Sequence, residues 1–161
     1  MVQCFFYGTG QSDEGICVEV QTSHYRILLD CGLRDTSILQ TLESPDLILV
    51  SHADPDNIRS LLFLHQKFPD VPIYSSTITA QFIGLTNPSS LPSSLSPLIQ
   101  IIDWRSPTEL LPNLTVQLFP AGHLTGAAVI LLTDTSDDRP QTIFYAPDLS
   151  LTNSRLTDGL K

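Results

Sequence analysis

The sequence is short of basic residues. Its 161 residues include eight Lys and Arg against seventeen Asp and Glu, so the formal net charge at neutral pH is −9. A surface of that sign repels polyanions instead of releasing their counterions. The chain alone is therefore a poor match for nucleic acid, and we expect contact with nucleic acid only through another domain.

Cysteine is also scarce. Cys4, Cys17 and Cys31 are odd in number, lie in or beside apolar segments and form no Cys-x-x-Cys pair. This pattern favours buried reduced thiols over a disulfide framework or a zinc knuckle.

Long apolar runs are missing as well. No stretch of about 18 apolar residues exists, and the amino terminus has neither a basic nor a long apolar segment before a cleavage site. We therefore expect no membrane span, no membrane partner, no signal peptide and a cytoplasmic location. A hydrophobic content of 42% is enough to build the core of one domain over residues 1–161.

Apolar segments alternate with polar turns along the chain. Helices are expected at 58–68 and 77–85, and strands at 2–6, 15–20, 25–30, 47–50, 72–74, 98–102, 114–119, 127–133 and 142–145. The continuous apolar run 47–50 is typical of a strand covered on both faces. The Pro- and Ser-rich segment 86–97 is expected to be a surface connection. The pattern predicts a layered α/β fold with helices against mixed sheets.

The segment 51–57, Ser-His-Ala-Asp-Pro-Asp-Asn, carries four side chains able to face one cation. His52, Asp54, Asp56 and Asn57 follow the apolar strand and precede a helix, and open α/β sheets usually hold ligands at the carboxyl ends of strands. A structural alternative exists, in which Asp54 or Asp56 caps the amides of the helix N-terminus.

This segment resembles the metal-binding loop of the metallo-β-lactamase superfamily, His-x-His-x-Asp-His. His52 and Asp56 match its first His and its Asp, whereas Asp54 and Asn57 stand at the second and third His. Three further segments agree with the family in order and spacing: 27–32 with its early strand, 121–126 with its second His loop and 145–150 with its bridging-Asp loop.

Other segments resemble the β-CASP branch of that superfamily, which contains ribonuclease J and the mRNA 3′-end processing endonuclease. They are the opening Phe-Tyr-Gly-Thr-Gly of 6–10, and the run 68–74 followed by Thr77 and Thr79. The resemblance implies an αββα sandwich of which 1–161 form the amino-terminal part, without the carboxyl-terminal half and any β-CASP insert. An apolar sheet face would then need cover from the missing half, a partner chain or a second copy, with strands 114–145 as the contact.

The resemblance also implies a set of metal ligands. A first metal would be held by His52, Asp54 and His123, a second position would be formed by Asp56 and Asn57, and Asp148 would bridge the two. A carboxylate at 54 is a legitimate ligand that shifts preference toward manganese or magnesium, whereas the amide of Asn57 is a poor zinc ligand. We expect one divalent metal, zinc or manganese, or none.

Two other roles follow from the same comparison. Asp30 is expected to hydrogen-bond and orient the loop without binding metal, and Asp56 would orient the attacking water if the protein is active. For His123, a plain turn residue is the alternative.

Two functions remain open. In the first, the domain is catalytically weak or inactive, because two of four loop ligands are replaced, and it is a binding or scaffolding part of a larger RNA-processing-type protein. In the second, it is an active metal-dependent phosphodiesterase or ribonuclease with one metal or an altered metal. An unrelated α/β domain with a fortuitous motif is the third interpretation.

Overall fold

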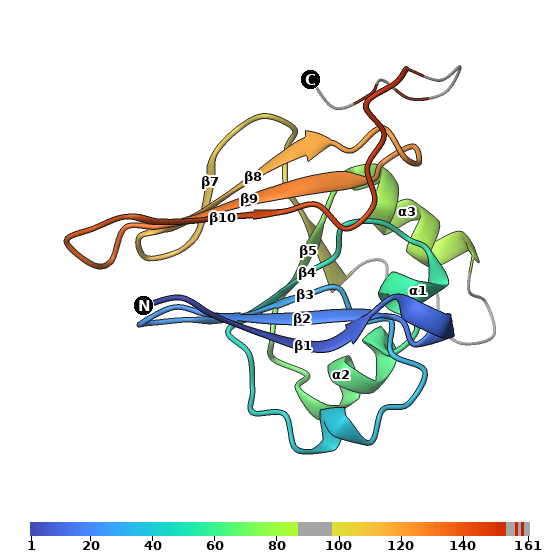
Figure 1. The fold of residues 1–161 in the computed structure, drawn as a ribbon, viewed down its shortest axis with the longest axis horizontal. Coiled ribbons are helices and arrows are strands. Elements are labelled where there is room, and N and C mark those ends of the chain that lie inside the picture. The colour runs from blue at the N-terminus through green and yellow to red at the C-terminus, as the bar shows by residue number, and fades with distance from the viewer. Residues whose placement is uncertain (87–97, 154–156, 158, 160–161) are drawn as a thin grey trace.

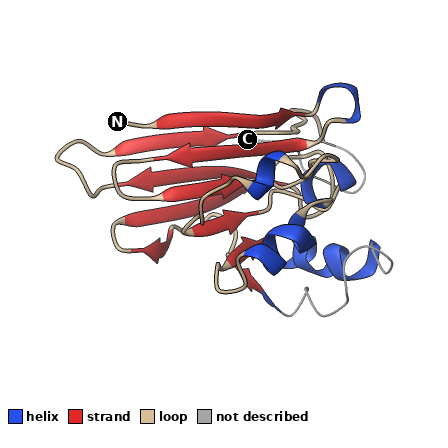
Figure 2. Cartoon of the chain, turned by 90° about the horizontal axis from the view of Figure 1, so that it is seen from below, coloured by secondary structure: helices blue, strands red, loops and turns tan. Residues whose placement is uncertain are grey.

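The computed structural model describes residues 1–86, 98–153, 157 and 159. In that part of the chain, the strands form two stacked sheets, and the helices gather at one end and against one side (Figures 1 and 2). The α/β class with mixed sheets is confirmed.

The larger sheet, sheet A, has six strands in sequence order: β1 (Gln3–Thr9), β2 (Ile16–Gln21), β3 (Arg26–Leu29), β4 (Leu47–Leu49), β5 (Ile73–Ser75) and β6 (Ile99–Ile101). Its first three strands are antiparallel, and β3 to β6 are parallel. Sheet B is antiparallel in the order β10 (Gln141–Tyr145), β9 (Ala128–Asp134), β8 (Leu114–Pro120) and β7 (Thr108–Leu111).

Helices cover one face of sheet A, and sheet B covers the other. The helices are α1 (Pro55–Ile58), α2 (Leu61–Lys67) and α3 (Thr77–Thr86), with short 3-10 turns η1 (Gln11–Asp13) and η2 (Ile38–Gln40). Alternate strand residues serve the two cores: Ile48 packs on the helices, whereas Leu47 and Leu49 pack between the sheets. The continuous apolar run at 47–50 is therefore explained by burial on both faces.

The outer face of sheet B is different. All three helices contribute buried residues to the core beneath sheet A, so among the described elements no helix is packed into a core on the outside of sheet B (Figure 1). The described layers are thus helix, sheet and sheet. In this part of the chain, no helix has the length and apolar character needed to cross a membrane.

Three expectations from the sequence needed correction: one helix, one strand and the burial of one cysteine. The helix expected at 58–68 is interrupted, because the backbone N–H and hydroxyl of Ser60 both donate to the Cys31 carbonyl, at 2.8 Å each. Strand β7 was not foreseen. Cys4 is exposed, since β1 is an edge strand with few buried side chains, whereas Cys17 and Cys31 are buried free thiols. Most of the Pro- and Ser-rich segment, 87–97, lies outside the described residues.

Candidate metal centre

Loops from both sheets bring four of the expected ligands to one end of the sandwich. His52 lies just after β4 and Asp54 just before α1, while His123 lies in the turn between β8 and β9 and Asp148 follows β10. Residues far apart in the sequence thus meet at one end of the sandwich.

Asp54 lies close to both His52 and His123, and Asp148 lies close to His52. Asp54 Oδ2 lies 3.6 Å from His52 Nε2 and 3.6 Å from His123 Nε2, and Asp148 Oδ2 lies 3.5 Å from His52 Nε2. The two imidazole rings stand edge to face, with centroids 5.3 Å apart. His52, Asp54 and His123 each offer one ligand atom, and these atoms all lie within 4.8 Å of one another.

This arrangement fits a single divalent ion. Ligand atoms about 2.1 Å from a tetrahedral ion are themselves about 3.4 Å apart, which is close to the separations found here. His52 is 1% exposed, and its Nε2 has no hydrogen-bond partner among the described residues. A buried polar atom without a partner is costly, and an ion bound by Nε2 would satisfy it. The side chains of Asp54 and Asp148 are 42% and 45% exposed, so the centre is open to solvent on their side.

Asp30 anchors the loop behind His52. Its Oδ1 accepts the backbone N–H of Ser51 at 2.8 Å, and its Oδ2 accepts Ser51 Oγ at 2.7 Å, Asn57 Nδ2 at 2.8 Å and Tyr145 OH at 2.7 Å. Complete burial raises the pKa of the Asp30 carboxyl, and these hydrogen bonds oppose the rise.

The same contacts favour one tautomer of His52. Ser51 has one hydroxyl proton and donates it to Asp30, so at the 2.9 Å contact between Ser51 Oγ and His52 Nδ1 the serine accepts. With Asp30 ionised, this arrangement favours the tautomer that carries the proton on Nδ1 and leaves the Nε2 lone pair toward the carboxylates of Asp54 and Asp148. A hydrogen bond of this kind is how proteins orient metal-binding histidines.

The backbone around Asp30 is tightly packed against the His52 loop. Asp30 has a left-handed φ of 55°, and the Cys31 N–H donates to the Asn57 carbonyl at 2.7 Å. A Cβ at Gly32 would lie 1.6 Å from the carbonyl oxygen of Asp56, so only glycine fits there. The two segments are thus held in one relative position.

Asp56 and Asn57 do not join the cluster, which is formed by His52, Asp54, His123 and Asp148. Asn57 is 1% exposed, and its amide donates to Asp30. Asp56 Oδ1 pairs with Arg59 Nη2 at 3.0 Å, one turn further along. Both side chains are therefore engaged apart from the four candidate ligands, and the metal and water roles expected for Asp56 stay predictions.

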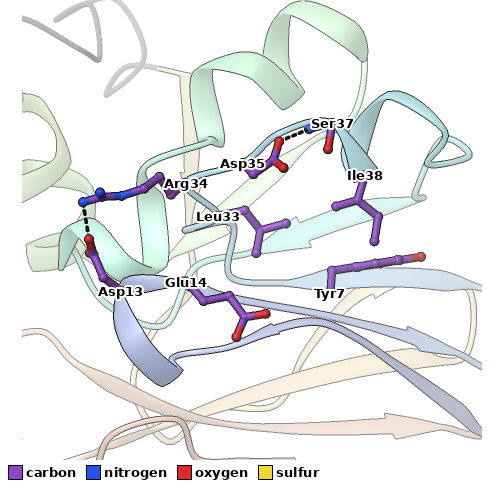
Figure 3. Close-up of a pocket in the computed structure, with 8 residues that line it drawn as sticks. All are labelled: Tyr7, Asp13, Glu14, Leu33, Arg34, Asp35, Ser37 and Ile38. Atoms are coloured by element: carbon purple, nitrogen blue, oxygen red, sulfur yellow. Dashed lines mark hydrogen bonds and ion pairs between the residues drawn. The ribbon is translucent and has the colours of Figure 1, made fainter.

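A chain of ion pairs leads away from Asp56. Arg59 also lies 3.4 Å from Asp13, and Asp13 pairs with Arg34. Figure 3 shows Arg34 reaching Asp13 at the rim of a cavity of about 490 Å³, beside Tyr7, Leu33 and Ile38. This cavity is lined by none of the four candidate ligands, so it is separate from the candidate centre.

The capping alternative is not supported for Asp54. Its backbone is extended and stands at the N-cap of α1, but its side chain makes no capping hydrogen bond. Sequence reasoning did not identify two residues of the site, Ser51 and Tyr145, which both donate to Asp30. The available signals were a polar residue directly after the apolar run 47–50 and a tyrosine at the end of an apolar strand.

Comparison with known proteins supports the same fold and ancestry. Residues 25–160 match the family described as "Beta-lactamase superfamily domain". The chain is 44% identical over 156 residues to the Synechocystis protein sll0514, with 96% of this chain and 28% of that protein aligned. It is 26% identical to "Probable RNase MJ4" of Methanocaldococcus jannaschii, with 98% of this chain and 41% of the relative aligned. The chain thus spans less than half the length of these relatives.

Among solved structures, the fold resembles the metallo-β-lactamase fold protein YhfI of Bacillus subtilis. The TM-score is 0.66 at 19% identity, covering 91% of this chain and 62% of YhfI. The superfamily resemblance seen in the sequence is confirmed, and the RNase-type relative agrees with the expected branch.

Proposed function

The chain belongs to the beta-lactamase superfamily, and from that premise we propose that it is a one-metal member with weak or lost catalysis. In this proposal, it serves as a binding or scaffolding part of a larger RNA-processing-type protein. A bound divalent ion can polarise a phosphoryl oxygen or lower the pKa of a water. His52, Asp54, His123 and Asp148 would hold that ion.

The proposal rests on the different orientations of the side chains in the 51–57 loop. His52 and Asp54 face His123, whereas Asn57 donates to Asp30 and Asp56 pairs with Arg59. The side chains that stand at the second metal position are therefore engaged with protein groups. A two-metal site clamps both the attacking and the leaving oxygen, so a chain with one occupied position is expected to hydrolyse phosphodiesters poorly.

The link with RNA rests on the relative named as a probable RNase and on the resemblance of the motifs. The net charge of −9 argues that RNA, if bound, contacts another domain.

Metal analysis with a hydrolysis assay tests the proposal. The purified chain is offered Zn²⁺ or Mn²⁺ at neutral pH, bound metal is counted, and cleavage of single-stranded RNA is followed. We expect one ion per chain, lost in His52→Ala and retained in the control His65→Ala on α2, with no RNA cleavage above the His52→Ala background. Absence of metal in the unchanged chain would overturn the metal site.

An active one-metal hydrolase is the second candidate. The solvent-open side of the centre, at Asp54 and Asp148, favours it, because substrate could reach a bound ion. Metal-dependent RNA cleavage that His52→Ala abolishes would establish this function instead.

The outer face of sheet B is the proposed contact with the remainder of the protein or with a second copy. Phe144 is 57% exposed there, and Leu131 is its neighbour across β9 and β10. Sedimentation of the chain at micromolar concentration should show self-association when no partner is present. Phe144→Lys should weaken it about tenfold or more, or ~1.4 kcal/mol, whereas Ile38→Lys on η2 should not. A monomer at all concentrations would argue against this contact.

A further inference from the structure

Tyr145 joins the two sheets behind the metal centre. It is the last residue of β10 in sheet B, yet its hydroxyl donates to Asp30 Oδ2, beyond β3 in sheet A, at 2.7 Å. Burial, together with the neighbouring Asp30 carboxylate, raises the pKa of the Tyr145 phenol. The hydroxyl therefore keeps its proton and acts as a donor at neutral pH.

The Tyr145 hydroxyl completes the surroundings of one carboxylate oxygen. Asp30 Oδ2 accepts from Ser51 Oγ, Asn57 Nδ2 and Tyr145 OH. Three donors leave this buried oxygen satisfied and favour the charged carboxylate. Ser51 then has a strong acceptor for its proton and presents a lone pair to His52 Nδ1.

Tyr145 also stands at the base of the loop that carries Asp148. Only Ala146 and Pro147 separate Tyr145 from Asp148, and the proline restricts the backbone between them. The Tyr145 hydroxyl thus ties to Asp30 the residue from which this segment starts, and the Asp148 carboxylate lies 3.5 Å from His52 Nε2. Two of the four candidate ligands are therefore connected to the same hydroxyl, His52 through Asp30 and Ser51, and Asp148 through the backbone.

We propose that Tyr145 is a positioning residue of the metal centre, which holds His52 in its Nδ1-protonated tautomer and Asp148 in ligand position. This inference rests on the proposed metal site. It adds a residue that never touches the metal and that comes from the other sheet.

The test is Tyr145→Phe, which keeps the ring and removes only the hydroxyl. The matched control is Tyr25→Phe, because the Tyr25 hydroxyl donates at the same distance, 2.7 Å, to the Pro112 carbonyl, away from the centre. Two quantities are measured in each variant: the Kd for Zn²⁺ and Mn²⁺ by calorimetry, and the His52 tautomer by long-range ¹H–¹⁵N NMR of the metal-free chain. Denaturant unfolding shows whether the two variants lose similar stability.

In the unchanged chain and in Tyr25→Phe, we expect His52 to be protonated on Nδ1. In Tyr145→Phe, we expect a mixture of tautomers and a 10- to 100-fold weaker Kd, the usual effect of removing a partner outside the ligand sphere. A Tyr145→Phe variant that keeps both the tautomer and the Kd of Tyr25→Phe would overturn the inference.

A double-mutant cycle with Ser51→Ala separates this relay from a general loss of stability. If Tyr145 acts on His52 through Asp30 and Ser51, the hydroxyl loss should have little further effect on the tautomer once Ser51 is replaced. Fully additive effects would contradict the relay. If the unchanged chain binds neither metal, the proposed function fails, and the NMR comparison alone still decides whether Tyr145 sets the His52 tautomer.

Discussion

Asp56 and Arg59 form an ion pair, with 3.0 Å between Oδ1 and Nη2, on the first turn after the His52 loop. Both side chains are partly exposed, so this contact contributes little to stability, about 0.2–1 kcal/mol. The ion pair matters because it orients the Asp56 carboxylate toward Arg59, although the family pattern assigns this carboxylate to the metals.

The first prediction follows from that orientation. Asp56→Asn should change the Kd for Zn²⁺ or Mn²⁺ by less than about twofold, whereas Asp54→Asn should weaken binding by at least about 100-fold, more than the loss of an outer partner. Isothermal calorimetry on the two variants measures the difference. Equal losses would show that Asp56 leaves Arg59 when the ion binds.

The second prediction concerns Asn57. Restoring the family histidine by Asn57→His should not produce a second bound metal, because Asp56 remains paired with Arg59. The variant should lose about 1–3 kcal/mol of unfolding free energy, since a larger ring replaces a buried amide that donates to Asp30 at 2.8 Å. Metal counting and urea unfolding test both parts, with Gln66→His on the surface of α2 as control. Two tightly bound ions per chain would refute it.

The third prediction concerns the pH dependence of stability. Burial would raise the pKa of Asp134, but hydrogen bonds from Ser136 and Thr22 outweigh it and lower the pKa. A carboxyl with a lowered folded pKa stabilises the protein above its unfolded pKa of about 3.9, and this contribution is lost as pH falls through the folded value.

Asp134→Asn should therefore reduce the free energy of unfolding by about 1 kcal/mol at pH 7, and the difference should shrink below about pH 4. Urea unfolding between pH 3 and pH 7 measures it, with the exposed Asp138→Asn as control. A difference that grows toward acid pH would contradict the sign of the shift.

The fourth prediction concerns Lys67 at the end of α2. Its ammonium donates to the carbonyls of Leu39, Gln40 and Leu42 at 2.7, 2.7 and 2.8 Å, which closes the η2 segment onto the helix. Lys67→Met should cost about 1.5–3 kcal/mol, because charged hydrogen bonds to partly buried carbonyls are lost. Urea unfolding measures the loss, and Arg139→Met in an exposed loop should be nearly neutral. Equal small losses would mean that water replaces the ammonium at no cost.

The sequence predicted the fold and most of the cluster for a physical reason. The periodicity of a strand follows from burial on one or both of its faces. The continuous apolar run at 47–50 therefore predicted a strand covered on both faces. The candidate ligands His52, Asp54, His123 and Asp148 follow strands, and the ends of strands in packed sheets meet. Motif order was therefore enough to anticipate that these four side chains lie together.

The sequence could not predict what depends on a single tertiary contact. The break between α1 and α2 arises from the Cys31 carbonyl, which captures both donors of Ser60. The direction of Asp56 depends on Arg59, and the role of Tyr145 depends on how closely sheet B approaches Asp30. None of these contacts leaves a periodic signal, because each involves one pair of residues.

The origin of the four candidate ligands from two sheets has a consequence for the order of folding. His52 and Asp54 belong to sheet A, whereas His123 and Asp148 belong to sheet B, so neither sheet alone presents a complete cation site. A cation should therefore be captured only after the sheets have docked, and non-local docking is a slow step. Bound metal would then slow unfolding more than it speeds folding, and its release would report the moment at which the two sheets separate.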